Sequence, residues 1–223
     1  MAPSLPPTSG INLLTAAHRD AIVASELRGY LPSLGLHEVA PRRWIDGSRP
    51  PVRRLFELRL LKGAAMTPWW GFSLDFVPHI SGGDLRWHRS DRTAMLDVIV
   101  NPAGIVQPSF LYGARRLTDD LRELLAEIVP AIERTWLRGS TDASMLEIIH
   151  DLKEHGGNCY HYENYTQLPL AHAFLTAKIG DVGSARRLLQ NYMSKRRDSL
   201  KEDVPTRLRR HIDDLGQSRP NDS

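Results

Sequence analysis

Residues 52–79 read VRRLFELRLLKGAAMTPWWGFSLDFVPH and form the most apolar and most clearly periodic stretch of the chain. In the first arm, Phe56, Leu58 and Leu60 alternate with a mixed set of neighbours, and the second arm repeats this pattern from Trp70 to Phe76. A period of two predicts β-strands, because a helix would need apolar residues every three or four positions. The link at 62–68 is short and rich in turn residues, which favours an antiparallel pair. We therefore expect one face of this pair on a core and the other face partly in water.

The flanking residues extend this pair into a larger fold. Upstream we expect a helix over 11–30, which would cover the stripe of Phe72, Leu74 and Phe76, and a strand over 39–45. Downstream we expect strands over 85–88 and 93–100. From Thr118 the pattern changes to helical, and we expect helices over 118–136, 143–154, 168–179, 182–193 and 200–215. The sequence thus predicts an α+β fold: an N-terminal helix, an antiparallel meander sheet of about five strands, and an all-helical C-terminal half with one helical hairpin.

The same pattern divides the chain into four parts. We expect residues 1–10 to be a flexible lead and 216–223 a disordered tail. Residues 11–115 would form the helix and sheet, and residues 116–215 a helical region that packs on the sheet as one unit.

Composition is that of an ordinary soluble protein, with 41% hydrophobic and 25% charged residues in 223. No run of about eighteen apolar residues is present, so no membrane span is expected. The start, MAPSLPPTSG, lacks the basic and apolar regions of a secretory signal. Cys159 is the single cysteine, which rules out an internal disulfide and favours a reducing compartment. We therefore expect a cytoplasmic protein.

Positive charge is concentrated near the C-terminus, although the net charge is only +3. Residues 186–215 carry nine lysines and arginines against five acids. Such a stretch binds nucleic acid or an acidic protein in some proteins, but it is more often the solvated face of a helix. Nucleic acid therefore stays open as a partner, and no membrane partner is expected.

Metal-ligand and acid–base side chains are densest in IHDLKEHGGNCYHYENY, residues 149–165. His150, His155, Cys159 and His161 are the candidates for a metal site, and Cys159 with His161 is a candidate nucleophile pair. Their spacing matches no established zinc pattern. We therefore expect no metal and no cofactor, and the ordinary interpretation is a polar loop at the edge of the core.

A second group of titratable residues lies on the predicted sheet: Asp75, His79, His88 and Asp97. If the strands pair as expected, Asp75 and Asp97 face the same side. Two carboxylates beside a histidine suit general acid–base chemistry or a divalent metal. The alternative is an outward sheet face that carries such residues for solubility.

Aromatic and arginine side chains form a third group, because tryptophan and arginine are the commonest anchors of protein interfaces. The candidate binding residues are Trp69, Ser73, Asp75, Trp87, Arg186, Arg187, Arg196 and Arg197. In the alternative interpretation, the C-terminal helices cover the second sheet face and the tryptophans are structural.

Three segments in order suggest a relationship: Leu34-Gly35-Leu36, GFSLDFVPHI at 71–80 and LAHAFLTAKIGDVGSARRLL at 170–189. Over about residues 15–193 the chain resembles a bacterial family of uncharacterised domains associated with toxin–immunity and defence loci. The resemblance implies a small cytoplasmic protein that binds a partner, and it brings no catalytic residues.

The sequence therefore favours a non-enzymatic protein-binding module, immunity-like or defence-associated, over an enzyme. Two alternatives stay open. One is a hydrolase or metal-binding protein that uses the His/Cys loop or the Asp75/Asp97 sheet face, and the other is a nucleic-acid-associated protein that uses the basic C-terminal helices.

Overall fold

A five-stranded antiparallel sheet forms the centre of the protein in a computed structural model, which describes residues 14–46, 50–60, 66–100, 114–155, 167–196 and 199–217. Its strand order is β1-β2-β3-β4-β7. The strands are β1 (His37–Ala40), β2 (Arg43–Asp46), β3 (Val52–Leu60), β4 (Met66–Leu74) and β7 (Val98–Val100). Between β4 and β7, β5 (His79–Ser81) and β6 (Asp84–Arg86) form a separate two-stranded hairpin. The predicted pair is β3 and β4, which align from Val52 opposite Leu74 to Leu60 opposite Met66.

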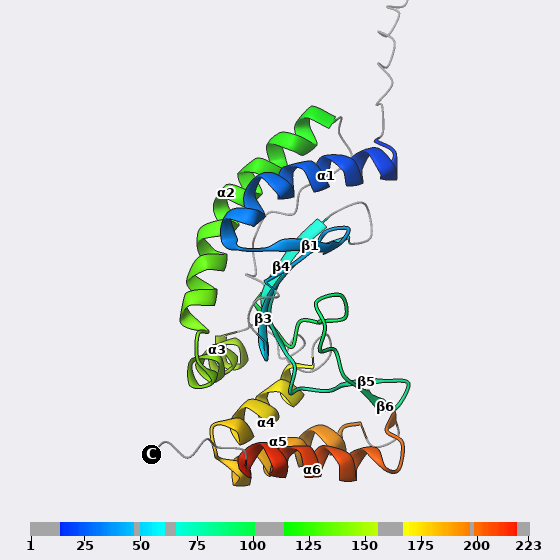
Figure 1. The fold of residues 1–223 in the computed structure, drawn as a ribbon, viewed down its shortest axis with the longest axis vertical. Coiled ribbons are helices and arrows are strands. Elements are labelled where there is room, and N and C mark those ends of the chain that lie inside the picture. The colour runs from blue at the N-terminus through cyan, green and yellow to red at the C-terminus, as the bar shows by residue number, and fades with distance from the viewer. Residues whose placement is uncertain are drawn as a thin grey trace, which may run out of the picture.

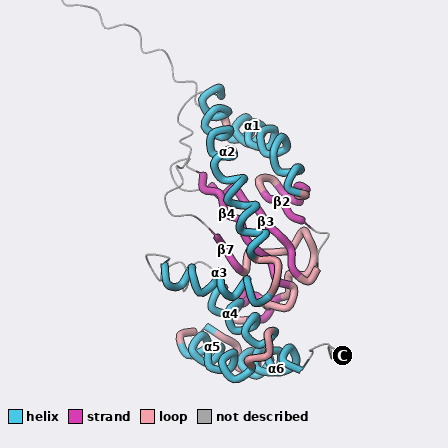
Figure 2. Tube along the Cα trace, turned by 90° about the vertical axis from the view of Figure 1, so that its left-hand side faces the viewer, coloured by secondary structure: helices cyan, strands magenta, loops and turns pink. Residues whose placement is uncertain are grey.

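Helices lie along one side of the sheet and beyond its ends, and they fill the C-terminal half, as the sequence predicts for an α+β fold (Figure 1). They are α1 (Ala16–Tyr30), η1 (a 3-10 turn, Leu31–Leu34), α2 (Ala114–Arg138), α3 (Asp142–His155), α4 (Leu168–Lys178), α5 (Val182–Ser194) and α6 (Val204–Gln217). Figures 1 and 2 show α1 and α2 side by side at one end of the molecule, and α4, α5 and α6 together at the other end. The predicted helical hairpin is the α4–α5 pair.

The first face of the sheet packs on α2. Two tryptophans fix this contact: Trp70 Nε1 donates to Thr135 Oγ1 at 3.2 Å, and Trp136 Nε1 donates to the Gly71 carbonyl at 3.2 Å. The prediction that the helix at 11–30 covers this face is therefore wrong in part, since α1 packs mainly on α2 (Figure 1). A 25-residue helix is about 37 Å long, so α2 spans the strands and presents a continuous apolar stripe to them.

The second face is covered by residues 87–96, which we call the strap. Ala94 and Leu96 from this segment pack against Ile45, Leu55 and Trp69 in a small apolar cluster. All nine residues of β4 are buried as a result. The prediction that this face is partly wet is confirmed beyond the strap, where the Arg59 side chain is 38% exposed. The alternative, in which the C-terminal helices cover this face, is wrong.

Two predicted strands are also corrected. The strand over 39–45 is two strands, because the chain reverses at Pro41 and Arg42, where Arg42 has a φ of 65°. The strand over 93–100 is paired only at Val98–Val100. In residues 93–97 the alternation of exposed Met95 with buried Ala94 and Leu96 reflects burial against the sheet without strand pairing.

A single contiguous core joins the sheet to the helices, and it includes Trp70, Leu121, Leu170 and Leu208. The predicted lead at 1–10 lies outside the described residues, as does the predicted tail from residue 218 onward. The predicted tail begins too early, since α6 continues through Gln217. Among the described residues, no helix combines the length and apolar character needed to cross a membrane.

Candidate functional site

The strap is held to the sheet by one buried guanidinium, that of Arg53 on β3. Its Nε donates to Asp91 Oδ1 at 3.0 Å, and its Nη2 donates to the Arg89 carbonyl at 2.7 Å. Its Nη1 pairs with Asp75, just beyond β4. Arg89 Nε in turn donates to the Asp75 carbonyl at 3.1 Å. A planar fork with several donors suits this role, because it binds several acceptors at fixed angles.

A second buried connection joins Asp97, immediately before β7, to His79 on β5. Asp97 Oδ2 accepts from the Leu74 backbone N–H at 2.7 Å. Asp97 Oδ1 lies 2.8 Å from His79 Nε2, although not on the line of the ring N–H bond. Burial raises the pKa of the Asp97 carboxyl, and the nearby His79 opposes that rise. Two oxygen atoms thereby connect β4, β5 and β7.

The other nitrogen of His79 faces the start of α4. With its amide oxygen turned toward β5, Gln167 accepts from His79 Nδ1 at 3.3 Å and from the Ile80 N–H at 2.9 Å. Its amide nitrogen then donates to the Pro78 carbonyl at 3.0 Å. Nδ1 of His79 is therefore hydrogen-bonded to Gln167, Nε2 lies beside the Asp97 carboxyl, and the side chain is only 5% exposed.

Some of the titratable candidates on the sheet lie close together, and one does not. The structure brings together His79, His88 and Asp97, with the rings of His79 and His88 edge to face at 4.5 Å. Burial and the neighbouring His79 lower the pKa of His88. Asp75 is paired with Arg53 instead. The geometry suits attachment of the strap and of α4 to the sheet, since no nitrogen of His79 is presented to a substrate.

Two of the candidate binding residues on β4 are internal. Trp69 is buried, and the guanidinium of Arg59 lies 3.6 Å from its ring centroid. Ser73 is also buried, and its Oγ accepts from the Met95 N–H at 3.2 Å. Neither side chain is available to a partner, because the strap covers that face.

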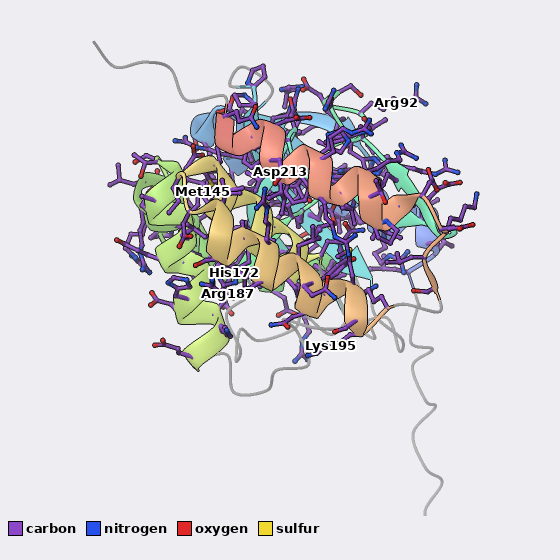
Figure 3. All side chains as sticks on the ribbon, turned by 90° about the horizontal axis from the view of Figure 1, so that it is seen from below. Arg92, Met145, His172, Arg187, Lys195 and Asp213 are labelled. Carbon is purple, nitrogen blue, oxygen red and sulfur yellow. The ribbon has the colours of Figure 1, made fainter. Side chains whose placement is uncertain are left out.

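The basic residues of the C-terminal helices are mostly engaged within the protein. Arg186 pairs with Asp213 across α5 and α6 at 2.9 Å, and Arg187 donates to Ser184 at 2.8 Å. Figure 3 places Arg187 on α5 and Asp213 on α6, seen from that end of the molecule. The guanidinium of Arg196 lies 5.0 Å from the Tyr192 ring centroid. Of these contacts, the Arg186–Asp213 ion pair reduces the charge that α5 and α6 offer to a ligand.

Trp87 is the aromatic candidate that remains at the surface. Trp87 is half-buried. The His211 ring of α6 lies edge to face with it at 4.9 Å, and the Arg89 guanidinium lies 4.1 Å from the centroid of the Trp87 ring. Arg86 and Arg210 are exposed, and neither is ion-paired with any residue in the described part of the chain. We call Trp87, Arg86, Arg89, Arg210 and His211 the Trp87 surface. Burial lowers the pKa of His211, the nearby Asp214 carboxylate opposes that shift, and Arg207, Arg89 and Arg210 lower the pKa further.

The remaining candidates concern the loop between α3 and α4. His150 lies on α3, and its Nε2 is 3.2 Å from Nε2 of His172 on α4. His155 is the last residue of α3, and Cys159 and His161 lie outside the described residues. The surface candidate Arg197, which follows α5, also lies outside them. Within the described ranges, no three His, Cys, Asp or Glu side chains gather in a way that could hold a metal ion.

Sequence reasoning missed several residues that matter here, namely Arg53, Arg89, Gln167, His172 and His211. The run RWHR at 86–89 is the signal that could have identified Arg89, because it places arginines on both sides of Trp87. The others are distant in sequence from their partners.

Comparison with known proteins gives no relative. No family model matches the chain, and no curated protein and no solved structure matches it. The resemblance to the toxin–immunity family therefore stays a prediction.

Proposed function

We propose that this protein is a non-enzymatic binding module that docks an acidic protein partner on the Trp87 surface. The observation that carries the proposal is a surface tryptophan in contact with both a histidine ring and an arginine guanidinium. Tryptophan and arginine are the residues that most often dominate binding energy at interfaces.

The arrangement suits binding because its parts are already ordered. Arg89 is fixed by its bond to the Asp75 carbonyl and by Arg53, which binds the Arg89 carbonyl. Its guanidinium and the His211 ring then limit the rotation of Trp87. A side chain that is ordered before binding loses less conformational entropy when the partner arrives.

Charge indicates the chemistry of the partner. Arg86 and Arg210 are exposed and form no ion pair with the described residues, while Asp84 lies within electrostatic range of Arg86, so part of their positive charge is available to an acidic surface. The sequence resemblance makes an acidic bacterial toxin or nuclease the partner class of first interest. In this proposal the protein is an immunity-like module that covers its partner.

Two observations favour a protein partner over nucleic acid. On α5 and α6, the Arg186–Asp213 and Arg207–Asp203 ion pairs compensate two of the positive charges. A nucleic-acid site needs several free cations along a phosphate backbone, and its affinity depends steeply on salt. The Trp87 surface is compact and centred on an aromatic ring.

The test measures binding of defined probes by fluorescence anisotropy. One probe set is a peptide panel in which the content of Asp, Glu and aromatic residues varies, and the other is mixed-sequence duplex DNA and single-stranded RNA. We expect acidic aromatic peptides to bind the wild type, and Trp87→Ala and Arg89→Gln to weaken them by about tenfold each. Arg187→Gln is the matched control, since it removes an exposed arginine from α5.

The proposal fails if Arg187→Gln weakens peptide binding as much as Arg89→Gln does, or if no acidic peptide binds. Preferential binding of the nucleic acids, with affinity falling steeply as salt rises, would instead support the nucleic-acid alternative.

A further inference from the structure

His150 and His172 bring two imidazole nitrogens together between α3 and α4. Their Nε2 atoms are 3.2 Å apart, and the ring centroids are 5.1 Å apart with the planes inclined at 69°. With both rings neutral, one Nε2 carries a proton and donates it to the lone pair of the other. The two nitrogens thus already converge on one point.

The separation is that of two ligands of one metal ion. Zinc binds histidine nitrogen at about 2.0–2.1 Å, so two ligands in a tetrahedral array lie about 3.3–3.4 Å apart. The observed distance requires only a small adjustment to accept an ion in place of the bridging proton. We propose that His150 and His172 form an exchangeable binding site for a borderline transition-metal ion, Zn²⁺ or Cu²⁺.

The two rings differ in their exposure to solvent. His172 is buried, and burial together with His150 and Lys153 lowers its pKa to about 4, so its imidazole is neutral at neutral pH. Metal binding requires the neutral form of histidine. His150 is exposed, which leaves the ion open to solvent. Imidazole ligands favour Cu²⁺ over Zn²⁺ in the general order of affinity.

Lys153 sets the expected strength of the site. Its positive charge acts on His172 and opposes a bound cation as well. This opposition predicts a weak site that loads and unloads readily. Lys153→Gln should therefore bind the ion more tightly than the wild type.

Calorimetric titration of the full-length protein with Zn²⁺ and Cu²⁺ tests the proposal. We expect one ion per chain and at least about a tenfold loss of affinity in both His150→Gln and His172→Gln, since even indirect supports of a metal site contribute that much. His18→Gln, which alters an exposed histidine of α1, is the matched control and should bind like the wild type. In the Cu²⁺ complex, electron paramagnetic resonance should show coupling to two nitrogen nuclei.

The His150→Gln variant keeps the test decisive if the buried His172 variant fails to fold, because His150 is exposed. The proposal is wrong if His150→Gln retains wild-type affinity, if only one nitrogen is coupled to Cu²⁺, or if neither ion binds at millimolar concentration.

Discussion

The two faces of the β3–β4 pair are covered in different ways. On the first face, α2 lays an apolar stripe over the sheet, with Trp70 and Trp136 each donating one hydrogen bond across the contact. On the second face, the strap lies over a smaller apolar cluster and is tied down by Arg53 and Asp97. Apolar packing tolerates small displacements, whereas charged hydrogen bonds fix positions and angles. The second face is therefore the one suited to present a fixed side chain, Trp87, at the surface.

The largest expected effect is on the α2 face. Phe72→Ala removes a fully buried ring that lies against Gly139, where a Cβ would come within 2.2 Å of Phe72 Cζ. We expect the free energy of unfolding to fall by about 3–5 kcal/mol, because the close packing around the ring leaves a cavity. Urea unfolding measures this.

The control for that change is Leu137→Ala on the outer side of α2, where the side chain is 77% exposed. It should alter stability by no more than about 0.5 kcal/mol. Similar losses for the two variants would mean that α2 does not cover the sheet as described.

The next effect concerns the strap. Arg53→Leu leaves Asp75 and Asp91 without their shared cation, and we expect a loss of about 2–3 kcal/mol. The strap should also open locally, so hydrogen exchange at the Met95 and Asp97 amides should accelerate more than exchange within α2. Uniform acceleration in both regions would contradict the separation of the two faces.

The α2 face was largely predictable from the sequence, and the strap face was not. Period-two alternation from Phe56 to Phe76 reflects burial on a core, and β3 and β4 follow from it. The same alternation over 93–97 predicts a strand that does not form, because Ala94 and Leu96 belong to the strap and are buried against the sheet without pairing in it.

The candidate site was predictable only at single residues. Asp97, His79 and Trp87 carried the right chemistry, but their partners Gln167 and His211 come from α4 and α6, far along the chain. No local pattern encodes such contacts, because they depend on how the C-terminal helices pack against the sheet.

A smaller effect separates charge from hydrogen bonding within the strap face. Asp97→Asn retains an acceptor for the Leu74 N–H and offers an amide to His79, so we expect a cost of about 1–2 kcal/mol near pH 4. Burial raises the folded-state pKa of Asp97 above its ordinary 3.8, so its contribution is fully present below that value and is lost as pH rises through the raised pKa. The stability gap between wild type and variant should therefore narrow with rising pH, as urea unfolding from pH 4 to 8 measures. A gap that widens would show that the ionised carboxylate, paired with His79, is the stabilising form.

The smallest stability effect belongs to the residue with the largest proposed role. Trp87→Ala removes one edge-to-face contact and one cation–π contact at a half-buried position, and we expect a loss of about 0.5–1 kcal/mol. Exchange at the Met95 amide should stay slow, because Arg53 still holds the strap. Binding of acidic peptides should fall by about tenfold, a change out of proportion to the stability loss. If stability falls instead by as much as in Arg53→Leu, and the strap opens with it, Trp87 is part of the cover of the sheet, and its exposed edge is a by-product of packing against α6.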